Sequence, residues 1–158
     1  MNGAHLHLLV NHLPIVGFAI GLILLATTML RRGDRGMFSA TVLVLVISGV
    51  GALAAQFTGE PAEEVVEELA DVSESLIDTH EDAGLMATIS AGITTFLAML
   101  IGVITLRREG SVRIMPTSIL FVATLVTCGA MAWTGSTGGK IRHAEVRGTM
   151  VFSPSSDD

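Results

Sequence analysis

Histidine is the residue type in this sequence best suited to chemistry, and its five copies lie in three places along the chain. His5, His7 and His12 are near the N-terminus, His80 is in the middle, and His143 is close to the C-terminus. A neutral imidazole ring binds zinc, copper or iron through one of its nitrogens. His5 and His12 are seven residues apart and share a helical face, whereas His7 points elsewhere.

Carboxylates stand at helical spacing near these histidines. Glu60 and Glu64 are four residues apart on one helical face, and Glu81 directly follows His80. Nitrogen and oxygen ligands together suit zinc, iron, copper or manganese. The sequence therefore predicts a transition-metal site whose ligands come from His5, His12, His80, His143, Glu60, Glu64 and Glu81.

A second form of metal binding is a b-type haem. His12 and His80 on facing helices would be its axial ligands, with Lys140, Arg142 or Arg147 near the propionates. The local excess of Glu and Asp argues against haem, because carboxylates repel propionates. The lack of a Glu-x-x-His or His-Glu-x-x-His motif argues against a mixed-ligand ion site, so both forms stay open.

The elements that must position these residues are transmembrane helices. Of the 158 residues only 15% are charged, the mean hydropathy is +0.65, and the net charge of −6 excludes a basic nucleic-acid-binding protein. Uncharged blocks cover about residues 6–30, 37–57, 83–106 and 114–134, each long enough to cross about 30 Å of hydrocarbon. We therefore predict an all-α, four-helix transmembrane bundle in contact with a lipid bilayer.

The distribution of basic residues predicts the orientation of this bundle. Arginines are concentrated in the connections after the first and third spans, which places both connections in the cytoplasm: Arg31, Arg32, Arg35, Arg107, Arg108 and Arg113. Both termini and residues 58–82 then lie on the outer side, together with all five histidines. Three basic residues in the C-terminal segment oppose this orientation but are outnumbered by those six arginines.

The connection formed by residues 58–82 carries ten acidic residues and no basic one. Its apolar residues recur at roughly helical spacing, which predicts an amphipathic helix outside the membrane that begins near Glu60 and Pro61. We expect the segment from Ser73 to continue directly into the third span. Residues 1–148 form the transmembrane domain, and residues 149–158 are expected to be a disordered tail.

An internal repeat indicates two hairpins of equal topology. Shifting the chain by 76 positions aligns Leu30-Arg31-Arg32 with Leu106-Arg107-Arg108 and Thr58-Gly59 with Thr134-Gly135, and nine of thirty positions are identical. The Leu-Arg-Arg and Thr-Gly segments both align at the same shift of 76 positions. Shared apolar composition alone therefore does not explain the match. We infer two hairpins related by a pseudo-twofold axis along the membrane normal.

Several segments together resemble a domain-of-unknown-function family of uncharacterised bacterial four-helix inner-membrane proteins. They are Asn11-His12-Leu13-Pro14-Ile15, the Thr58-Gly59-Glu60-Pro61 stretch, His80-Glu81, and Gly138-Gly139-Lys140 through His143. The family has a His-Phe-Pro-Ile-like start and a Thr-Gly-x-x-Gly-Gly close, and Leu13 stands where it often has Phe. The resemblance implies a multi-pass protein of the bacterial inner membrane and brings no established activity. With the orientation predicted from the arginines, both termini are then periplasmic.

The leading functional hypothesis is binding of a transition metal or haem in a His/Glu pocket at the periplasmic mouth, for redox or metal handling. The alternative is a non-catalytic subunit or scaffold of a membrane complex, or a homo-oligomer, whose acidic outer helix docks a partner. A third possibility is a proton-responsive element, since histidine titrates near pH 6.5. No catalytic residue is predicted, and enzymatic activity stays an open question.

Overall fold

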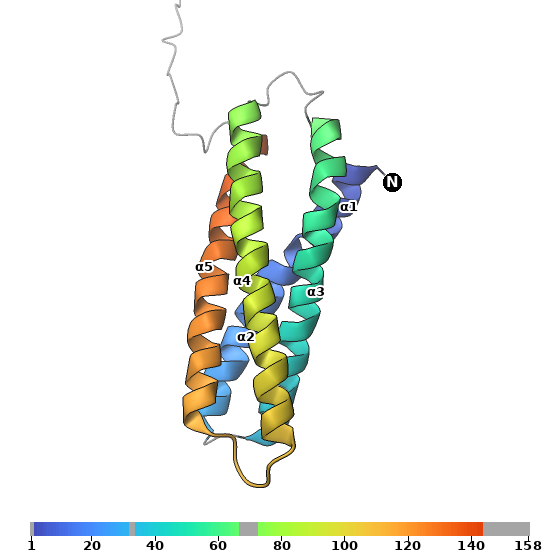
Figure 1. Cartoon of the computed structure of the whole chain (residues 1–158). Coiled ribbons are helices and arrows are strands. Elements are labelled where there is room, and N and C mark those ends of the chain that lie inside the picture. The colour runs from blue at the N-terminus through green and yellow to red at the C-terminus, as the bar shows by residue number, and fades with distance from the viewer. Residues whose placement is uncertain (1, 32–33, 67–72, 144–158) are drawn as a thin grey trace, which may run out of the picture.

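The computed structural model describes residues 2–31, 34–66 and 73–143, which fold into helices joined by short connections (Figure 1). Each of the four expected spans lies within a helix or, for the first span, a pair of consecutive helices. The helices are α1 Gly3–Val10, α2 His12–Leu30, α3 Arg35–Val66, α4 Glu74–Leu106 and α5 Ile114–Arg142. The described residues contain no strand, which confirms the all-α prediction.

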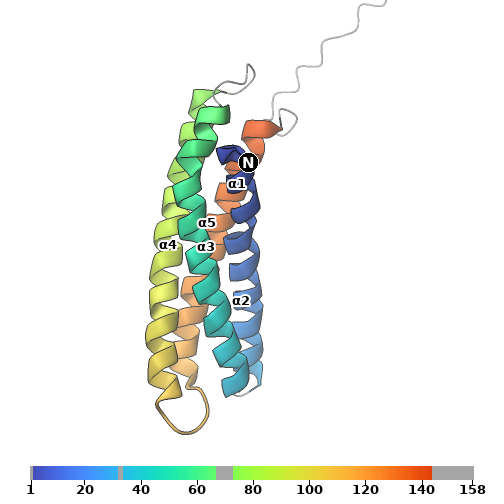
Figure 2. The same cartoon turned by 90° about the vertical axis from the view of Figure 1, so that its right-hand side faces the viewer.

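Helices α2, α3, α4 and α5 pack side by side as a four-helix bundle in which α2 also contacts α5. The short helix α1 packs mainly against α3. It is followed directly by α2, and the two helices together form one long arm (Figure 2). Four helical segments are long and apolar enough to cross a membrane. The predicted four-helix bundle is confirmed.

The outer surface of this bundle is apolar. Ile23, Leu43, Phe96 and Val126 are each more than 60% exposed, and they belong to four different helices. A water-soluble bundle would bury such side chains, whereas lipid solvates them. The exposed surface therefore has the composition of a membrane protein.

Small and hydroxyl-bearing residues bring the helices together in the interior. Ala91 and Ala98 of α4 are fully buried, and the hydroxyls of Thr94 and Thr127 lie 2.9 Å apart between α4 and α5. A side chain at Gly17 of α2 would overlap the Ser48 hydroxyl on α3. Small residues at helix interfaces permit the close backbone approach on which helix association in lipid depends.

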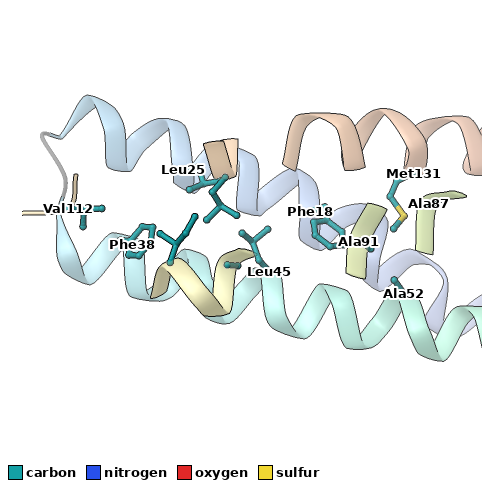
Figure 3. Packing of buried hydrophobic residues seen from close by; sticks show 12 residues of the cluster. Phe18, Leu25, Phe38, Leu45, Ala52, Ala87, Ala91, Val112 and Met131 are labelled. Atoms are coloured by element: carbon teal, nitrogen blue, oxygen red, sulfur yellow. The ribbon is translucent and has the colours of Figure 1, made fainter. Parts of the chain in front are cut away.

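One end of the bundle, which we call the arginine end, contains the α2–α3 and α4–α5 connections. Figure 3 shows Leu25, Phe38 and Leu45 filling the space between α2 and α3 near this end, and all three are fully buried. The guanidinium group of Arg35 donates hydrogen bonds to four backbone carbonyls, those of Thr105, Leu106, Arg108 and Gly110, at 2.7–3.2 Å. These bonds link the start of α3 to the end of α4.

The opposite end, which we call the histidine end, contains α1, the last turns of α3 and α5, and the first turns of α4. The expectation of a separate amphipathic helix within residues 58–82 is wrong for its described part, because α3 continues through Pro61 to Val66. Proline within a helix removes one backbone hydrogen bond, here at the carbonyl of Phe57, and helices can tolerate this loss. The prediction that the segment from Ser73 continues into the third span is confirmed, since α4 begins at Glu74.

The remaining predictions for the connection and tail concern residues outside the described ranges. Residues 67–72 of the acidic connection and the tail 149–158 are among these.

The internal repeat can be followed in the described helices α3 and α5. At positions 76 residues apart, hydroxyl side chains donate to the carbonyl four residues earlier in both helices: Thr41 and Thr117, Ser48 and Thr124, and Thr58 and Thr134.

Candidate functional site at the histidine end

A stripe of inward-facing residues runs along the α1–α2 arm and reaches the histidine end. Pro14, Phe18, Gly21, Leu25 and Thr28 of α2 are buried at alternating spacings of four and three residues. This heptad spacing marks the side of a helix that faces its neighbours. Continued toward the N-terminus, the same spacing reaches Asn11 and His7.

His7 is held against α3 by its ring nitrogen Nδ1, which lies 3.1 Å from the hydroxyl oxygen of Thr58. The Thr58 hydroxyl has one proton, and it donates that proton to the carbonyls of Ala54 and Ala55. When the Thr58 hydroxyl bonds these carbonyls, its oxygen accepts from His7 and the imidazole proton is on Nδ1. In that tautomer Nε2 of His7 carries the lone pair.

His80 of α4 is held against α5 in a similar way. Its Nδ1 lies 3.1 Å from both the backbone carbonyl oxygen of Thr134 and the hydroxyl oxygen of Thr137. A carbonyl can only accept, so the imidazole proton is again on Nδ1 and the lone pair is on Nε2. Hydrogen bonds of this type orient metal-binding histidines in proteins.

A glycine makes room for the His80 ring. A Cβ atom at Gly138 of α5 would lie 2.9 Å from Cε1 of His80 and 3.5 Å from Nε2. The ring therefore packs directly on the α5 backbone, and a side chain at position 138 would displace it. The neighbouring Gly139 has open space around its Cβ position, so the requirement is specific to Gly138.

The two anchored histidines come from different hairpins, His7 from the α1–α2 arm and His80 from α4. His7 and His80 are close enough for their charges to interact. At a rise of 1.5 Å per residue, His80 lies about 40 Å along α4 from Arg107, beyond the roughly 30 Å of a hydrocarbon core. The pair is therefore placed at the border between membrane and water.

The structure does not bring the other predicted ligands to His80. His5 and His12 are exposed, and Nδ1 of His12 lies 3.0 Å from the carbonyl oxygen of Leu8 in its own helical arm. His143 is exposed just after α5, and Glu60, Glu64 and Glu81 are all exposed. Among the described residues, no three His, Cys, Asp or Glu side chains form a group that could hold a metal ion.

His7 is an inward-facing histidine that the sequence does not single out. His5 and His12, which share a helical face by their seven-residue spacing, are both exposed. The useful signal was the heptad stripe His7, Asn11, Pro14 and Phe18, which continues the small and buried positions of the first span. Position in this stripe, and not spacing between histidines, separates the inward ring from the outward ones.

The charge around the site is negative. Six described carboxylates at the histidine end are exposed: Glu60, Glu64, Glu74, Asp78, Glu81 and Asp82. Such a concentration of one sign raises the local concentration of cations and lowers that of anions. The electrostatic environment therefore favours a positively charged ligand.

Access to the site comes from the histidine end. Figure 3 shows Phe18, Leu45, Leu25 and Phe38 following one another toward the arginine end, and all four side chains are fully buried. These side chains fill the interior toward the arginine end. A ligand of the histidine pair would enter from the aqueous side that faces α1.

Comparison with known proteins gives no match: no family model fits the chain, and no curated protein or solved structure is similar to it. The resemblance to a family of bacterial four-helix membrane proteins therefore stays a prediction from the motifs. With no similar protein to compare, the function is inferred from the geometry of the described residues.

Proposed function

We propose that this chain is a multi-pass protein of the bacterial inner membrane that binds a transition metal at the histidine end of its bundle. His7 and His80 are the ligand pair, and the role is redox chemistry or metal handling. The observation that carries the proposal is that each hairpin holds one imidazole through Nδ1, His7 at Thr58 and His80 at Thr134 and Thr137, so that Nε2 is the nitrogen that would bind the metal.

This arrangement reduces the cost of binding a metal. Each ring is already oriented by a threonine side chain of the neighbouring helix, Thr58 for His7 and Thr137 for His80. Ligands that are oriented beforehand lose less conformational freedom when the metal binds, and mutation of such outer partners commonly costs 10–100-fold in affinity. The threonines are therefore part of the proposed centre.

The charge of the surroundings favours an ion over haem. The six exposed carboxylates attract a cation, whereas haem would bring two propionates into the same region. Of the basic residues proposed as propionate partners, Lys140 lies within the described residues, on the last turn of α5. We therefore place iron, zinc, copper or manganese as an ion first, and b-type haem second.

The proposed orientation has the histidine end in the periplasm. Arg31, Arg35, Arg107 and Arg108 lie at the arginine end, and arginine-rich connections favour the cytoplasmic side. Both termini then lie on the periplasmic side, and the metal would enter from the periplasm. Fusion of a reporter that is active only in the cytoplasm to the connection after Leu106 tests this orientation.

Metal analysis and absorption spectroscopy of the full chain in mild detergent test the proposed function. The wild-type protein, expressed with ample metal, should carry close to one metal or one haem per chain. The double variant His7→Ala/His80→Ala should carry none while keeping its helical content. A wild-type protein without stoichiometric metal and without a Soret band would contradict the proposal.

A second candidate is a non-catalytic subunit whose acidic end docks a partner protein. It is favoured by α3 and α4, whose last and first turns carry exposed carboxylates such as Glu64 and Asp78. Charge reversal at Glu60 and Glu64 should then abolish assembly, and His80→Ala should leave it intact. The opposite pattern supports the metal centre.

A further inference from the structure

Asn11 connects α1 and α2 in a helical conformation. Its φ and ψ angles are −65° and −25°, and its backbone N–H donates a 2.9 Å hydrogen bond to the carbonyl of His7. Residues four apart in a helix have their side chains on one face, about 5–6 Å apart at Cβ. His7 and Asn11 therefore present their side chains to the same region.

The side-chain oxygen Oδ1 of Asn11 is buried and has no hydrogen-bond partner among the described residues. It is the one buried side-chain nitrogen or oxygen in those residues of which this is true. Buried polar atoms in folded proteins nearly always have a partner, because desolvation without compensation is unfavourable. An orphan acceptor next to a metal-binding histidine indicates that a bound species supplies the partner.

The packing of α2 on α5 sets the level of Asn11 along the bundle. Ile15, one turn along the arm from Asn11, lies 3.9 Å from the Cβ position of Gly135. Because α2 and α5 run in opposite directions, one turn outward from Gly135 is Gly138, which contacts the His80 ring. Asn11 is therefore level with His80 and one turn below His7.

We propose that Oδ1 of Asn11 is a third ligand of the metal ion held by His7 and His80, an inference that rests on the function proposed above. An i, i+4 pair on one helix is a common way to grip a metal, and His7 with Asn11 supplies nitrogen and oxygen at that spacing. With Nε2 of His80 the set is two nitrogens and one neutral oxygen. A first-row divalent ion with positions left open for water or substrate fits this set.

A three-ligand site of this kind differs from bis-histidine haem in a way that can be measured. Haem iron takes two axial ligands and has no position for Asn11, whereas an ion bound by His7, His80 and Asn11 depends on all three. The neutral ligands also leave the ion with its positive charge, which the surrounding carboxylates favour. Asn11 variants therefore separate the two forms of the proposed centre.

Titration of the full chain in detergent with Co²⁺ is the test, because its visible absorption reports the ligands. Asn11→Leu should lower Co²⁺ affinity at least tenfold and change the absorption bands. Asn11→Asp, which keeps the oxygen and adds a charge, should raise the affinity. The control Gln56→Leu removes another amide near this end, one that accepts from Thr88, and should leave the affinity unchanged.

Thermal unfolding adds a readout that a purely structural asparagine would not give. In metal-free protein Asn11→Leu should raise the Tm, because the orphan oxygen is gone. Excess Co²⁺ should raise the Tm of the wild type by more than it raises the Tm of Asn11→Leu. An equal rise in Tm for both proteins would overturn the role of Asn11.

The outcomes distinguish the two proposals. If His7→Ala and His80→Ala abolish Co²⁺ binding and both Asn11 variants leave affinity and spectrum unchanged, the third ligand is overturned and the proposed function stands. If the wild type carries haem and binds no Co²⁺, the same conclusion holds. If it binds neither Co²⁺ nor haem, both are overturned. Should Asn11→Leu fail to fold, the direction of the Asn11→Asp effect decides.

Discussion

The arginine end and the histidine end of the bundle differ in what holds the two hairpins together. At the arginine end Arg35 bonds four carbonyls of the other hairpin, and large side chains such as Phe38 fill the interior. At the histidine end α1 packs on α3 without approaching the backbone of α4 or α5. His7 is bonded to α3 and His80 to α5, each within its own hairpin. One end provides stability, and the other is free to hold a ligand.

The largest expected effect is at the packed end. Phe38→Ala should lower the free energy of unfolding by about 3–5 kcal/mol, because a fully buried aromatic ring leaves a cavity. Ile77→Ala, a buried position near the histidine end, should cost about 2 kcal/mol, the lower end of the range for a buried isoleucine. Thermal unfolding of both variants in detergent measures the difference. Equal losses of unfolding free energy in the two variants would contradict a difference in packing between the two ends.

The next effect concerns the metal centre alone. Gly138→Ala should lower metal affinity about 100-fold, because the new methyl group would lie 2.9 Å from Cε1 of His80 and turn the ring away. A factor of this size corresponds to about 2.7 kcal/mol. Gly139→Ala, where the added methyl group meets nothing, is the matched control and should bind as the wild type does. Equal binding by both variants would show that the His80 ring position does not matter.

The third effect concerns the hydrogen bonds of Arg35 at the arginine end. Arg35→Ala should cost about 2 kcal/mol, since it removes charged hydrogen bonds to carbonyls that are partly open to water. Metal affinity should change little, because the site is at the other end. The control Arg31→Ala removes an exposed arginine from the same end and should cost less than about 0.5 kcal/mol. A loss of metal binding in Arg35→Ala would mean that the two ends are coupled.

The smallest effect tests the anchoring of His7. Thr58→Val keeps the side-chain shape but removes the oxygen that accepts from Nδ1 of His7. Metal affinity should fall about tenfold, the lower end of the usual range for such outer partners. Thr79→Val, at an exposed threonine of α4, is the control and should leave the affinity unchanged.

The sequence was sufficient to predict the four long apolar helical segments. Uncharged blocks bounded by arginines and carboxylates leave few alternatives in lipid, because every backbone group must be bonded within its own segment. The offset that relates Thr58 to Thr134 also recurs in the hydrogen bonds of α3 and α5. These features are local or periodic, so they can be read without knowing how the helices pack.

The rotation of each helix about its axis could not be predicted in the same way. A membrane helix is apolar on all sides, so hydrophobic periodicity does not show which face is inward. For this reason the outward His12 was preferred over the inward His7. The predicted start of a separate helix at Glu60 and Pro61 failed because proline is favoured at a helix start but can also be tolerated within a helix.

Metal content measured in two single variants tests the central claim most directly. His7→Ala and His12→Ala remove the same imidazole from the same helical arm, one facing inward and the other outward. Both proteins are purified as full chains after expression with ample metal, and the bound metal is measured by elemental analysis. We predict that His7→Ala loses the metal while His12→Ala retains it, and loss in His12→Ala with retention in His7→Ala would contradict the proposed centre.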